Sequence, residues 1–270
     1  MISYLFRKMT DNSHLKAAIW RPVYNFLATK LPHNQWQFMN YGYAPSLNSA
    51  DSELPLPPNY ELQRSPLQMY YYLAEKGPIT GKKVLEVGSG RGGGAYFLFN
   101  HFHPASYTGL DLADKAVDLC RKTYHTPGLQ FVQGEAENLP FSNEEFDIVI
   151  NIESSRHYGS FAKFLSEVHR VLKPGGRLLL ADMRFDHETG SFRNDLASSA
   201  MEMKSFEDIT ENVILSLDRS HDAYIAEIEQ NVPRYFRRYF IEFSAVKGTE
   251  NYAAFKARKR QYFRAILEKK

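Results

Sequence analysis

The sequence has few of the features that mark secreted, membrane-spanning or nucleic-acid-binding proteins. It contains one cysteine, Cys120, so an intramolecular disulfide is excluded and a reducing, cytoplasmic compartment is expected. No run of about 18 apolar residues could span a bilayer, and the first residues lack the continuous apolar core of a signal peptide. The formal net charge is only +2, so the chain as a whole lacks the strongly basic character typical of nucleic-acid-binding proteins. We therefore expect a soluble protein without a nucleic-acid partner.

Metal-binding patterns are scarce as well. His101 and His103 lie two residues apart in an expected loop, and no cysteine lies near them. No metal is therefore expected. The 270 residues suffice for one large α/β domain with an appended lid and a well-buried core.

The segment Val84–Gly94 is the most informative part of the chain. An apolar strand ends there in a glycine turn that opens a helix, and glycines let the backbone approach a nucleotide-like ligand closely. The glycines at 88, 90 and 93 fit the G-x-G-x-x-G pattern, which dinucleotide-binding enzymes share. The acidic Glu86 stands in the strand where a dehydrogenase has an apolar residue. This favours a ligand with a positive charge.

The segments that follow distinguish a dinucleotide-binding enzyme from an enzyme that binds a positively charged cofactor. They are a short strand ending at Asp111, the run Phe131–Phe141, the apolar run Phe146–Asn151 and the run Leu172–Leu180. In this order the segments resemble class I S-adenosylmethionine-dependent methyltransferases. That resemblance implies S-adenosyl-L-methionine as the cofactor.

The resemblance can be narrowed further. His103–Leu112, Glu137–Phe141 and Val246–Thr249 are similar to segments of the phthiotriol/phenolphthiocerol dimycocerosate methyltransferases. Those enzymes methylate a hydroxyl on a lipid. The similarity runs from about Asn40 to the C-terminus and is strongest between Val84 and Arg184.

Strand and helix patterns alternate from Lys83 onward. Alternation of this kind predicts an α/β fold with a doubly wound, mostly parallel sheet covered on both faces, and the resemblance implies seven strands. Strands are expected at 83–87, 107–110, 129–133, 146–152 and 176–183, with helices at 92–101, 114–124 and 159–172. Two last strands, one of them reversed, are expected at 239–246 and 261–267.

The remaining segments are expected to cover this core. Residues 1–80 are predicted to form an N-terminal helical lid with helices near 14–30 and 61–76, and residues 81–270 the core with a helical insertion at 185–237. In that insertion Met201, Met203, Phe206, Ile209, Val213 and Leu215 are expected on one apolar helical face. The side chains of this face would either pack into the core or form a flexible wall beside a hydrophobic substrate.

The resemblance assigns parts of the cofactor to particular residues. Backbone N–H groups from Gly88 to Gly90 would meet the carboxylate, Asp111 the ribose, Glu135 and Ala136 the adenine, and Asn151 the ammonium group. A tyrosine of the segment Phe38–Tyr43 would close over the cofactor, with Tyr41 and Tyr43 as candidates. The expected cofactor-binding residues are Tyr41, Glu86, Gly88, Ser89, Gly90, Asp111, Leu112, Glu135, Ala136 and Asn151.

Methylation of an alcohol also requires a group that takes the hydroxyl proton. His157 follows the fourth strand, and a histidine titrates near neutral pH, so it is the expected general base. Asp182, at the end of the fifth strand, is the second candidate catalytic residue. His157 lies one position later than the histidine of the lipid methyltransferases, whose place is taken by Arg156.

Two basic, aromatic clusters stand out near the C-terminus. Residues 251–270 carry a net charge of +6 and the rest of the chain about −4, and Arg234–Phe240 forms a second cluster. They are either solvated surface or a site of transient, peripheral membrane contact.

These observations predict a methyltransferase that transfers a methyl group to a hydroxyl of a hydrophobic small molecule, either a lipid or a secondary metabolite. Carbon methylation of a quinone-like or polyketide acceptor is the alternative, and a catalytically decayed, cofactor-binding partner protein is another. Nucleic-acid amino methylation is disfavoured because Asn151–Ser154 is not Asn-Pro-Pro-Tyr. The Tyr252 and Lys256 spacing of short-chain dehydrogenases lies too late in the chain to count.

Overall fold

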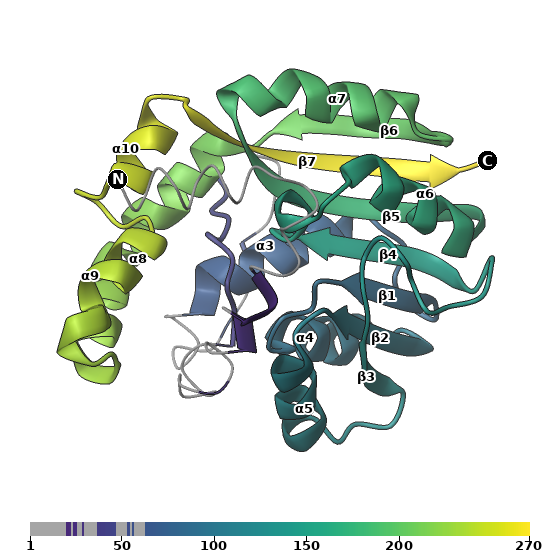
Figure 1. The fold of residues 1–270 in the computed structure, drawn as a ribbon, viewed down its shortest axis with the longest axis horizontal. Coiled ribbons are helices and arrows are strands. Elements are labelled where there is room, and N and C mark those ends of the chain that lie inside the picture. The colour runs from purple at the N-terminus through teal and green to yellow at the C-terminus, as the bar shows by residue number, and fades with distance from the viewer. Residues whose placement is uncertain are drawn as a thin grey trace.

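Seven strands form one sheet at the centre of the computed structural model, which describes residues 20–22, 24–25, 29, 37–46, 53–54, 56 and 63–270. The strand order is β3-β2-β1-β4-β5-β7-β6 (Figure 1). The strands are β1 (Lys83–Val87), β2 (Ser106–Asp111), β3 (Leu129–Gln133), β4 (Phe146–Ile152), β5 (Leu172–Phe185), β6 (Met201–Asp208) and β7 (Arg260–Lys269). Neighbours among β1 to β5 are parallel, and β7 is antiparallel to both β5 and β6. The predicted doubly wound, mostly parallel sheet is confirmed.

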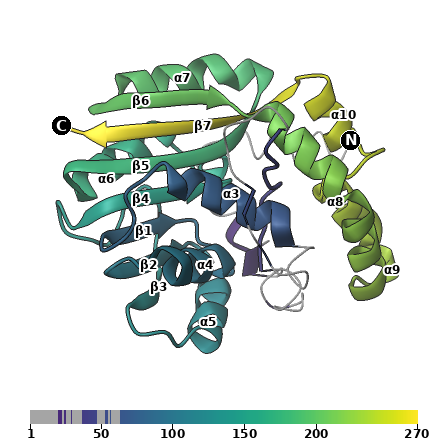
Figure 2. The same ribbon diagram turned by 180° about the vertical axis from the view of Figure 1, so that it is seen from behind.

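Helices cover both faces of this sheet, and each face has its own core. Side chains from α3 (Arg64–Glu75), α4 (Gly93–Phe102) and α5 (Asp114–Thr123) join one buried cluster. Those of α6 (Phe161–Val171) and α7 (Thr189–Ser198) join the other. Figure 2 shows α3 and α4 in front of the sheet, whereas α6 and α7 face the viewer in Figure 1. Successive residues of β1 alternate between the cores, with Val84 in one and Leu85 in the other, because side chains alternate along a strand.

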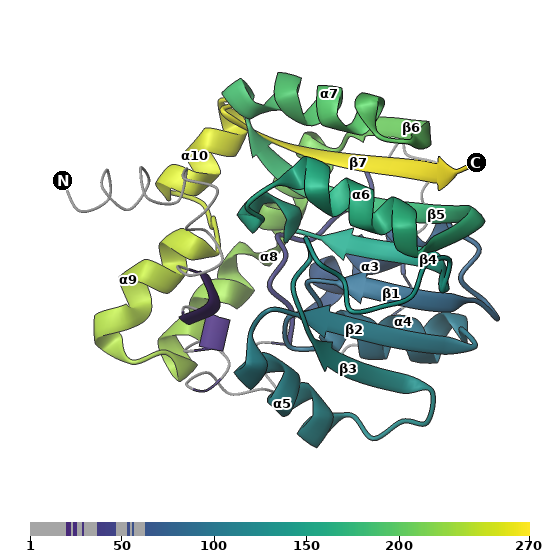
Figure 3. The ribbon, with the colours of Figure 1, turned by 45° about the vertical axis from the view of Figure 1, so that its right-hand side comes forward.

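Three helices stand at one end of the sheet. They are α8 (Thr210–Asn231), α9 (Arg234–Phe243) and α10 (Glu250–Lys256), and Figure 3 shows them beyond the carboxyl ends of β1, β2 and β4. Open α/β sheets bind ligands outside the carboxyl ends of their strands. These helices therefore stand where they can wall a ligand site.

The prediction of a helical segment at 185–237 holds for α7 and α8 and is wrong for the residues between them. Met201–Asp208 forms the edge strand β6, which pairs with β7 through Met201 and Lys269 at one end and Asp208 and Phe263 at the other. Tertiary pairing decides here, because an alternating Met-x-Met spacing fits the two-residue period of a strand as well as a helical face. The expected strand at 239–246 is also wrong, since residues up to Phe243 belong to α9.

The segment before β1 is described only in part. Most of the helix expected near 14–30 lies outside the described residues, although residues 20–22, 24, 25 and 29 are helical. The helix expected at 61–76 is α3. The extended stretch 37–46 runs between α3 and α8, held by hydrogen bonds from Tyr43 N to Ser65 O and from Ala44 N to Asn212 O. In the parts of the chain described above, no helix combines the length and apolarity needed to cross a bilayer.

Candidate active site

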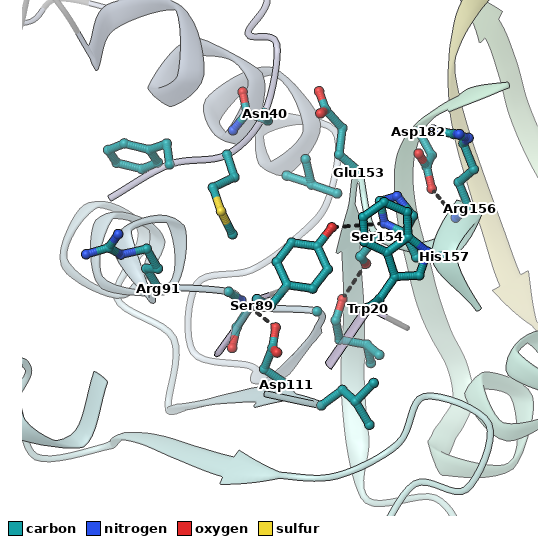
Figure 4. Close-up of a pocket in the computed structure, with 18 of the residues that line it drawn as sticks. Trp20, Asn40, Ser89, Arg91, Asp111, Glu153, Ser154, Arg156, His157 and Asp182 are labelled. Carbon is teal, nitrogen blue, oxygen red and sulfur yellow. Dashed lines mark hydrogen bonds between the residues drawn. The ribbon is translucent and has the colours of Figure 1, made fainter. Parts of the chain in front are cut away.

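A cavity of about 700 Å³ lies at the carboxyl ends of β1, β2 and β4. The glycine turn after β1 forms its floor, the stretch 37–41 covers it, and α8, the end of α9, α10 and the start of β7 close the far wall. Figure 4 shows Ser89 and Asp111 at one end, with Glu153, Asp182 and Arg156 at the other. The cavity thus has two groups of polar residues, one at each end, and a ligand lying along the cavity would contact both.

The glycine turn is shaped by its own hydrogen bonds. Gly88 and Gly90 have φ values of 79° and 54°, and a side chain at Gly88 would place Cβ 2.3 Å from Ser154 Oγ. The N–H groups of Gly88 and Ser89 both donate to Leu110 O, and that of Gly90 donates to Asp111 Oδ2. All three N–H groups thus have acceptors within the protein, so their expected contact with a ligand carboxylate stays a prediction that this geometry does not support.

One polar atom of the turn is left for a ligand. Ser89 Oγ is buried, lines the cavity and has no hydrogen-bond partner among the described residues. A buried hydroxyl without a partner is costly, so it marks a place where a bound polar group would complete the structure. This observation fits a cofactor with a charged amino-acid end.

Asp111 lies at the end of β2, as predicted, and lines the same end of the cavity. Its Oδ1 accepts from Ala113 N at 2.9 Å and its Oδ2 from Gly90 N at 2.8 Å. Burial raises the pKa of this carboxyl, while the backbone donors at Ala113 and Gly90 act against that rise. The two N–H groups hold the carboxylate in a fixed orientation at the cavity wall.

Three further predicted residues follow the same wall. Leu112 comes directly after Asp111, and Glu135 and Ala136 come after β3, and all three line the cavity. Gly134 N donates to Asp111 O, which ties the two loops together. The structure therefore brings the segments after β1, β2 and β3 to one place, as the sequence predicted.

Glu86 and Asn151 do not line the cavity, in contrast to the prediction. Both oxygens of Glu86 accept from tyrosine hydroxyls, Tyr70 and Tyr107, at 2.9 Å each, and burial raises its pKa to about 7. Asn151 is fully buried, and its amide group donates to Val87 O. Both side chains stabilise the strand ends from within, and direct contact with a ligand is not supported.

The two candidate tyrosines, Tyr41 and Tyr43, lie in different places. Tyr41 lines the cavity, its N–H donates to Glu153 Oε1 at 2.6 Å, and its ring contacts Phe255 edge-on at 5.3 Å. Tyr43 is buried instead and stacks on Tyr72 with ring centroids 3.9 Å apart. Met201, Met203 and Phe206 lie on the edge strand β6 and do not line the cavity either. Of the two alternatives for this face, core filling holds for Met201, which is buried in a core cluster, and the substrate wall is wrong.

His157 lies in a short 3-10 turn after β4, residues Ser155–His157, and lines the cavity. Its Nδ1 hydrogen-bonds to Tyr24 Oη at 3.1 Å, and its ring contacts Trp20 at a centroid distance of 4.2 Å. Figure 4 shows the rings of Trp20 and His157 close together, beside Ser154. When Nδ1 carries the proton and donates to Tyr24, Nε2 is the basic nitrogen of the ring.

Asp182 also lines the cavity, but its oxygens are already engaged. Oδ2 accepts from Ser155 Oγ at 2.5 Å and from Arg156 N at 3.1 Å, and the guanidinium of Arg184 lies 3.2 Å away. Oδ1 accepts from Met183 N. These contacts make Asp182 a positioning residue that fixes the turn carrying His157.

Sequence reasoning missed Glu153 as a site residue. It lines the cavity, has a left-handed backbone with φ 48°, and accepts from both Tyr41 N and Tyr262 Oη. Burial raises its pKa to about 8. The only available signal was an acidic residue directly after an apolar strand. The left-handed backbone and the two donors, which come from residues far away in the chain, cannot be read from that signal.

Comparisons with known proteins agree with this arrangement. Residues 85–180 match the methyltransferase domain family. The chain is 38% identical over 245 residues to the phthiotriol/phenolphthiotriol dimycocerosates methyltransferase of Mycobacterium leprae, covering 91% of this chain and 90% of that protein. It is also 38% identical to the fatty-acid O-methyltransferase of Mycolicibacterium smegmatis, covering 80% of this chain and 77% of that protein.

A solved structure supports the fold alone. A putative sarcosine dimethylglycine methyltransferase from Galdieria sulphuraria superposes with a TM-score of 0.69 at 16% identity, covering 88% of this chain and 96% of that one. The identity and coverage of the two mycobacterial proteins carry the assignment further. This chain is an enzyme that uses S-adenosyl-L-methionine, and it belongs to the family of S-adenosylmethionine-dependent methyltransferases that includes the phthiotriol/phenolphthiotriol dimycocerosates methyltransferases.

Proposed function

We propose that the protein transfers a methyl group to a hydroxyl of a hydrophobic small molecule, a lipid or secondary metabolite. The observation that carries the proposal is the cavity lining beyond Ser89 and Asp111. It is largely aromatic and aliphatic, which suits an acceptor that buries apolar surface. The residues concerned include Trp20, Tyr24, Phe38, Met39, Tyr41, Ile152, Met183, Tyr224 and Phe243. The named substrates of the two mycobacterial relatives are lipids or fatty acids, which supports the same class.

The residues at the Ser89 end fit the cofactor. Ser89 Oγ would bond its amino-acid end, Asp111 its ribose hydroxyls, and Leu112, Glu135 and Ala136 would surround its adenine. Tyr41 covers the path from the other side. When bound, S-adenosylmethionine supplies a methyl group on a positively charged sulfur, which an oxygen nucleophile can attack.

His157 is proposed to take the hydroxyl proton. A general base needs a free lone pair near the acceptor and a partner that fixes its orientation. Tyr24 and the Trp20 ring supply that orientation, and Asp182 fixes the turn through Ser155 and Arg156 N. Glu153 is the second candidate for the proton acceptor, because burial raises the pKa of its carboxyl to about 8, which is close to neutral pH.

A screen of acceptors tests the proposed function. Methyl-labelled S-adenosylmethionine is offered with lipid extracts, fatty alcohols and acids, quinols, nucleosides and RNA, and the label is followed by chromatography. We expect label in hydrophobic acceptors, on oxygen, and none in nucleosides. Label in RNA alone would overturn the proposal, and label on a quinol carbon would favour carbon methylation. Cofactor binding without any labelled product would favour a decayed partner protein.

Residues 1–80 are proposed to cover the core domain formed by residues 81–270. The stretch 37–41 and the described residues Trp20 and Tyr24 line the cavity together with core residues, which supports a lid over the site.

The single, buried Cys120 supports a cytoplasmic location.

Peripheral membrane contact is proposed for α9. Tyr235 and Tyr239 on this helix are 78% and 52% exposed, and Arg234 and Arg238 beside them are exposed as well. Aromatic and arginine side chains suit a lipid interface. We expect sedimentation with anionic vesicles at low salt, and at least a several-fold loss in a Tyr235→Ser, Tyr239→Ser variant. Sedimentation equal to that with zwitterionic vesicles, or unchanged in the variant, would refute the contact.

A further inference from the structure

The helical residues 20–22, 24 and 25 form a strap between two walls of the cavity. Figures 1 and 3 show them in dark purple between α9 and α5. Trp20 and Tyr24 line the cavity, and the Tyr24 ring packs on Ala113 and Ala116 at the start of α5. The same ring packs against a buried cluster formed by α8, α9 and the turn between them. One side chain of the strap thus bridges both walls.

The first turn of α5 is capped by Asn25 of the strap. Ala113 stands at the N-cap position, and within residues 113–123 no side chain caps the start of the helix. Asn25 Oδ1 accepts from Lys115 N at 3.1 Å, and Asn25 Nδ2 donates to Asp114 Oδ1 at 2.9 Å. The guanidinium of Arg21 lies 3.3 Å from the same Asp114 oxygen. The strap therefore supplies a cap that α5 does not provide for itself.

The loop beneath the strap is also the loop that orients Asp111. Ala113 N donates to Asp111 Oδ1 at 2.9 Å, and α5 begins at the next residue. Asp111 and Leu112 line the cavity at the end that fits the cofactor, and Tyr24 packs on this loop through Ala113. A ligand bound against Asp111 is therefore enclosed by the strap as well as by the glycine turn.

The strap also contacts the residue that is proposed as the base. Tyr24 Oη hydrogen-bonds to His157 Nδ1 at 3.1 Å, and the Trp20 ring centroid lies 4.2 Å from that of His157. Tyr24 and Asn25 are adjacent in the chain, so a movement that takes Asn25 away from α5 also takes Tyr24 away from His157. The position of the base and the enclosure of the cofactor site thus depend on the same helical turn.

We propose that Asn25 and Asp114 hold the strap closed over the bound cofactor, so that cofactor exchange requires the strap to open. Asn25 is then a positioning residue that acts on His157 through Tyr24. The side chains of Arg21 and Asp114 are partly exposed, so breaking these contacts costs little and the strap can open in each turnover. The part of the inference that concerns His157 rests on the proposed function, whereas the part that concerns the cofactor does not.

The rate at which S-adenosylhomocysteine is released tests whether the strap encloses the cofactor. Trp20 and Trp36 are the two tryptophans of the chain, so a Trp36→Phe background leaves Trp20 as the single tryptophan reporter. In this background, release on rapid dilution should be at least about fivefold faster for Asn25→Ala and for Asp114→Ala, the change expected from loss of a typical helix cap. Trp20 emission should move to longer wavelength in both variants, because an open strap exposes the ring to water.

Asn100→Ala is the matched control. Asn100 is an exposed asparagine whose side chain donates to Tyr96 O within α4, and it does not line the cavity. Its loss should leave release and emission unchanged. Release from Asn25→Ala and Asp114→Ala at the rate of the unaltered protein, or equally fast release from Asn100→Ala, would overturn the strap. A loss of helical circular dichroism in both strap variants would assign faster release to unfolding of α5 and would likewise overturn it.

A double-variant comparison tests the effect on His157. Tyr24→Phe keeps the ring on Ala113 but removes the hydroxyl, so release of S-adenosylhomocysteine should stay unchanged while turnover of a fatty alcohol falls several-fold. At saturating cofactor, Asn25→Ala should also lower this turnover, and the double variant should lose no more than the worse single variant. Additive losses would overturn the positioning role of Asn25. Absence of turnover in the unaltered protein would overturn the proposed function alone, because release and emission still report on the strap.

Discussion

Replacement of Asp111 by alanine is expected to weaken the binding of S-adenosylhomocysteine at least tenfold. Asp111 is held by Gly90 N and Ala113 N with its carboxylate at the cavity wall, so the two ribose hydroxyls would meet a fixed, charged acceptor. Each charge-assisted hydrogen bond contributes roughly 1.5–3 kcal/mol, and every 1.4 kcal/mol corresponds to a tenfold change in affinity. Loss of both bonds gives a drop that calorimetry measures directly.

The control for this variant is Asp118→Ala. Asp118 lies on α5, is half-buried, and has Lys115 as an ion-pair partner, 3.9 Å away. It does not line the cavity, so its loss should leave the affinity unchanged. Binding by Asp111→Ala as tight as that of the unaltered protein would contradict the assignment of the ribose site. Tight binding of NADH would contradict the cofactor.

The positions of the first strands along the chain could be predicted because their signals are local. β1, β3 and β4 have the predicted bounds, since apolar runs between glycine or polar turns fix them. β6 could not be predicted, because its partner β7 lies more than fifty residues later in the chain. The residues Met201 and Met203 carry no signal that tells an edge strand from a helical face, and only the pairing with β7 decides between them.

The site was predictable where a strand end carries the residue. Asp111, Ser89, Glu135 and His157 all line the cavity for that reason. The roles predicted for the site residues agree with the structure less well than their predicted positions do. The N–H groups of the glycine turn are used within the protein, and Glu86 is bound by two tyrosines, which are contacts that spacing in a sequence does not reveal.

The end of the cavity away from Ser89 shows the limit of sequence reasoning most clearly. Arg156 and Arg260 both line the cavity there but are more than one hundred residues apart, and both contact Phe185, which is distant from each of them in the chain. Arg260 was part of a basic run that favoured a solvated surface or a membrane contact. The reversed strand β7 brings Arg260 level with Phe185 in the sheet, and this register turns one residue of the run into a cavity residue.

The His157→Ala variant is expected to lower turnover of a fatty alcohol by about 10²–10⁴ while binding of S-adenosylhomocysteine stays nearly unchanged. The alcohol must lose its proton as the oxygen attacks, and His157, oriented by Tyr24 and Trp20, is the group proposed to take it. A carboxylic acid has already lost its proton at neutral pH, so its turnover should fall less than tenfold. The ratio of the two losses, from single-turnover rates, is the measurement.

The Glu153→Gln variant completes the comparison. Glutamine keeps an oxygen for Tyr41 N and Tyr262 Oη but has no carboxylate to take a proton. If His157 is the base, this variant should retain most of the alcohol turnover. A loss of 10² or more in Glu153→Gln, with near-normal turnover in His157→Ala, would assign the proton to Glu153. Near-normal alcohol turnover in both variants would instead mean that alignment of oxygen and methyl suffices for the reaction.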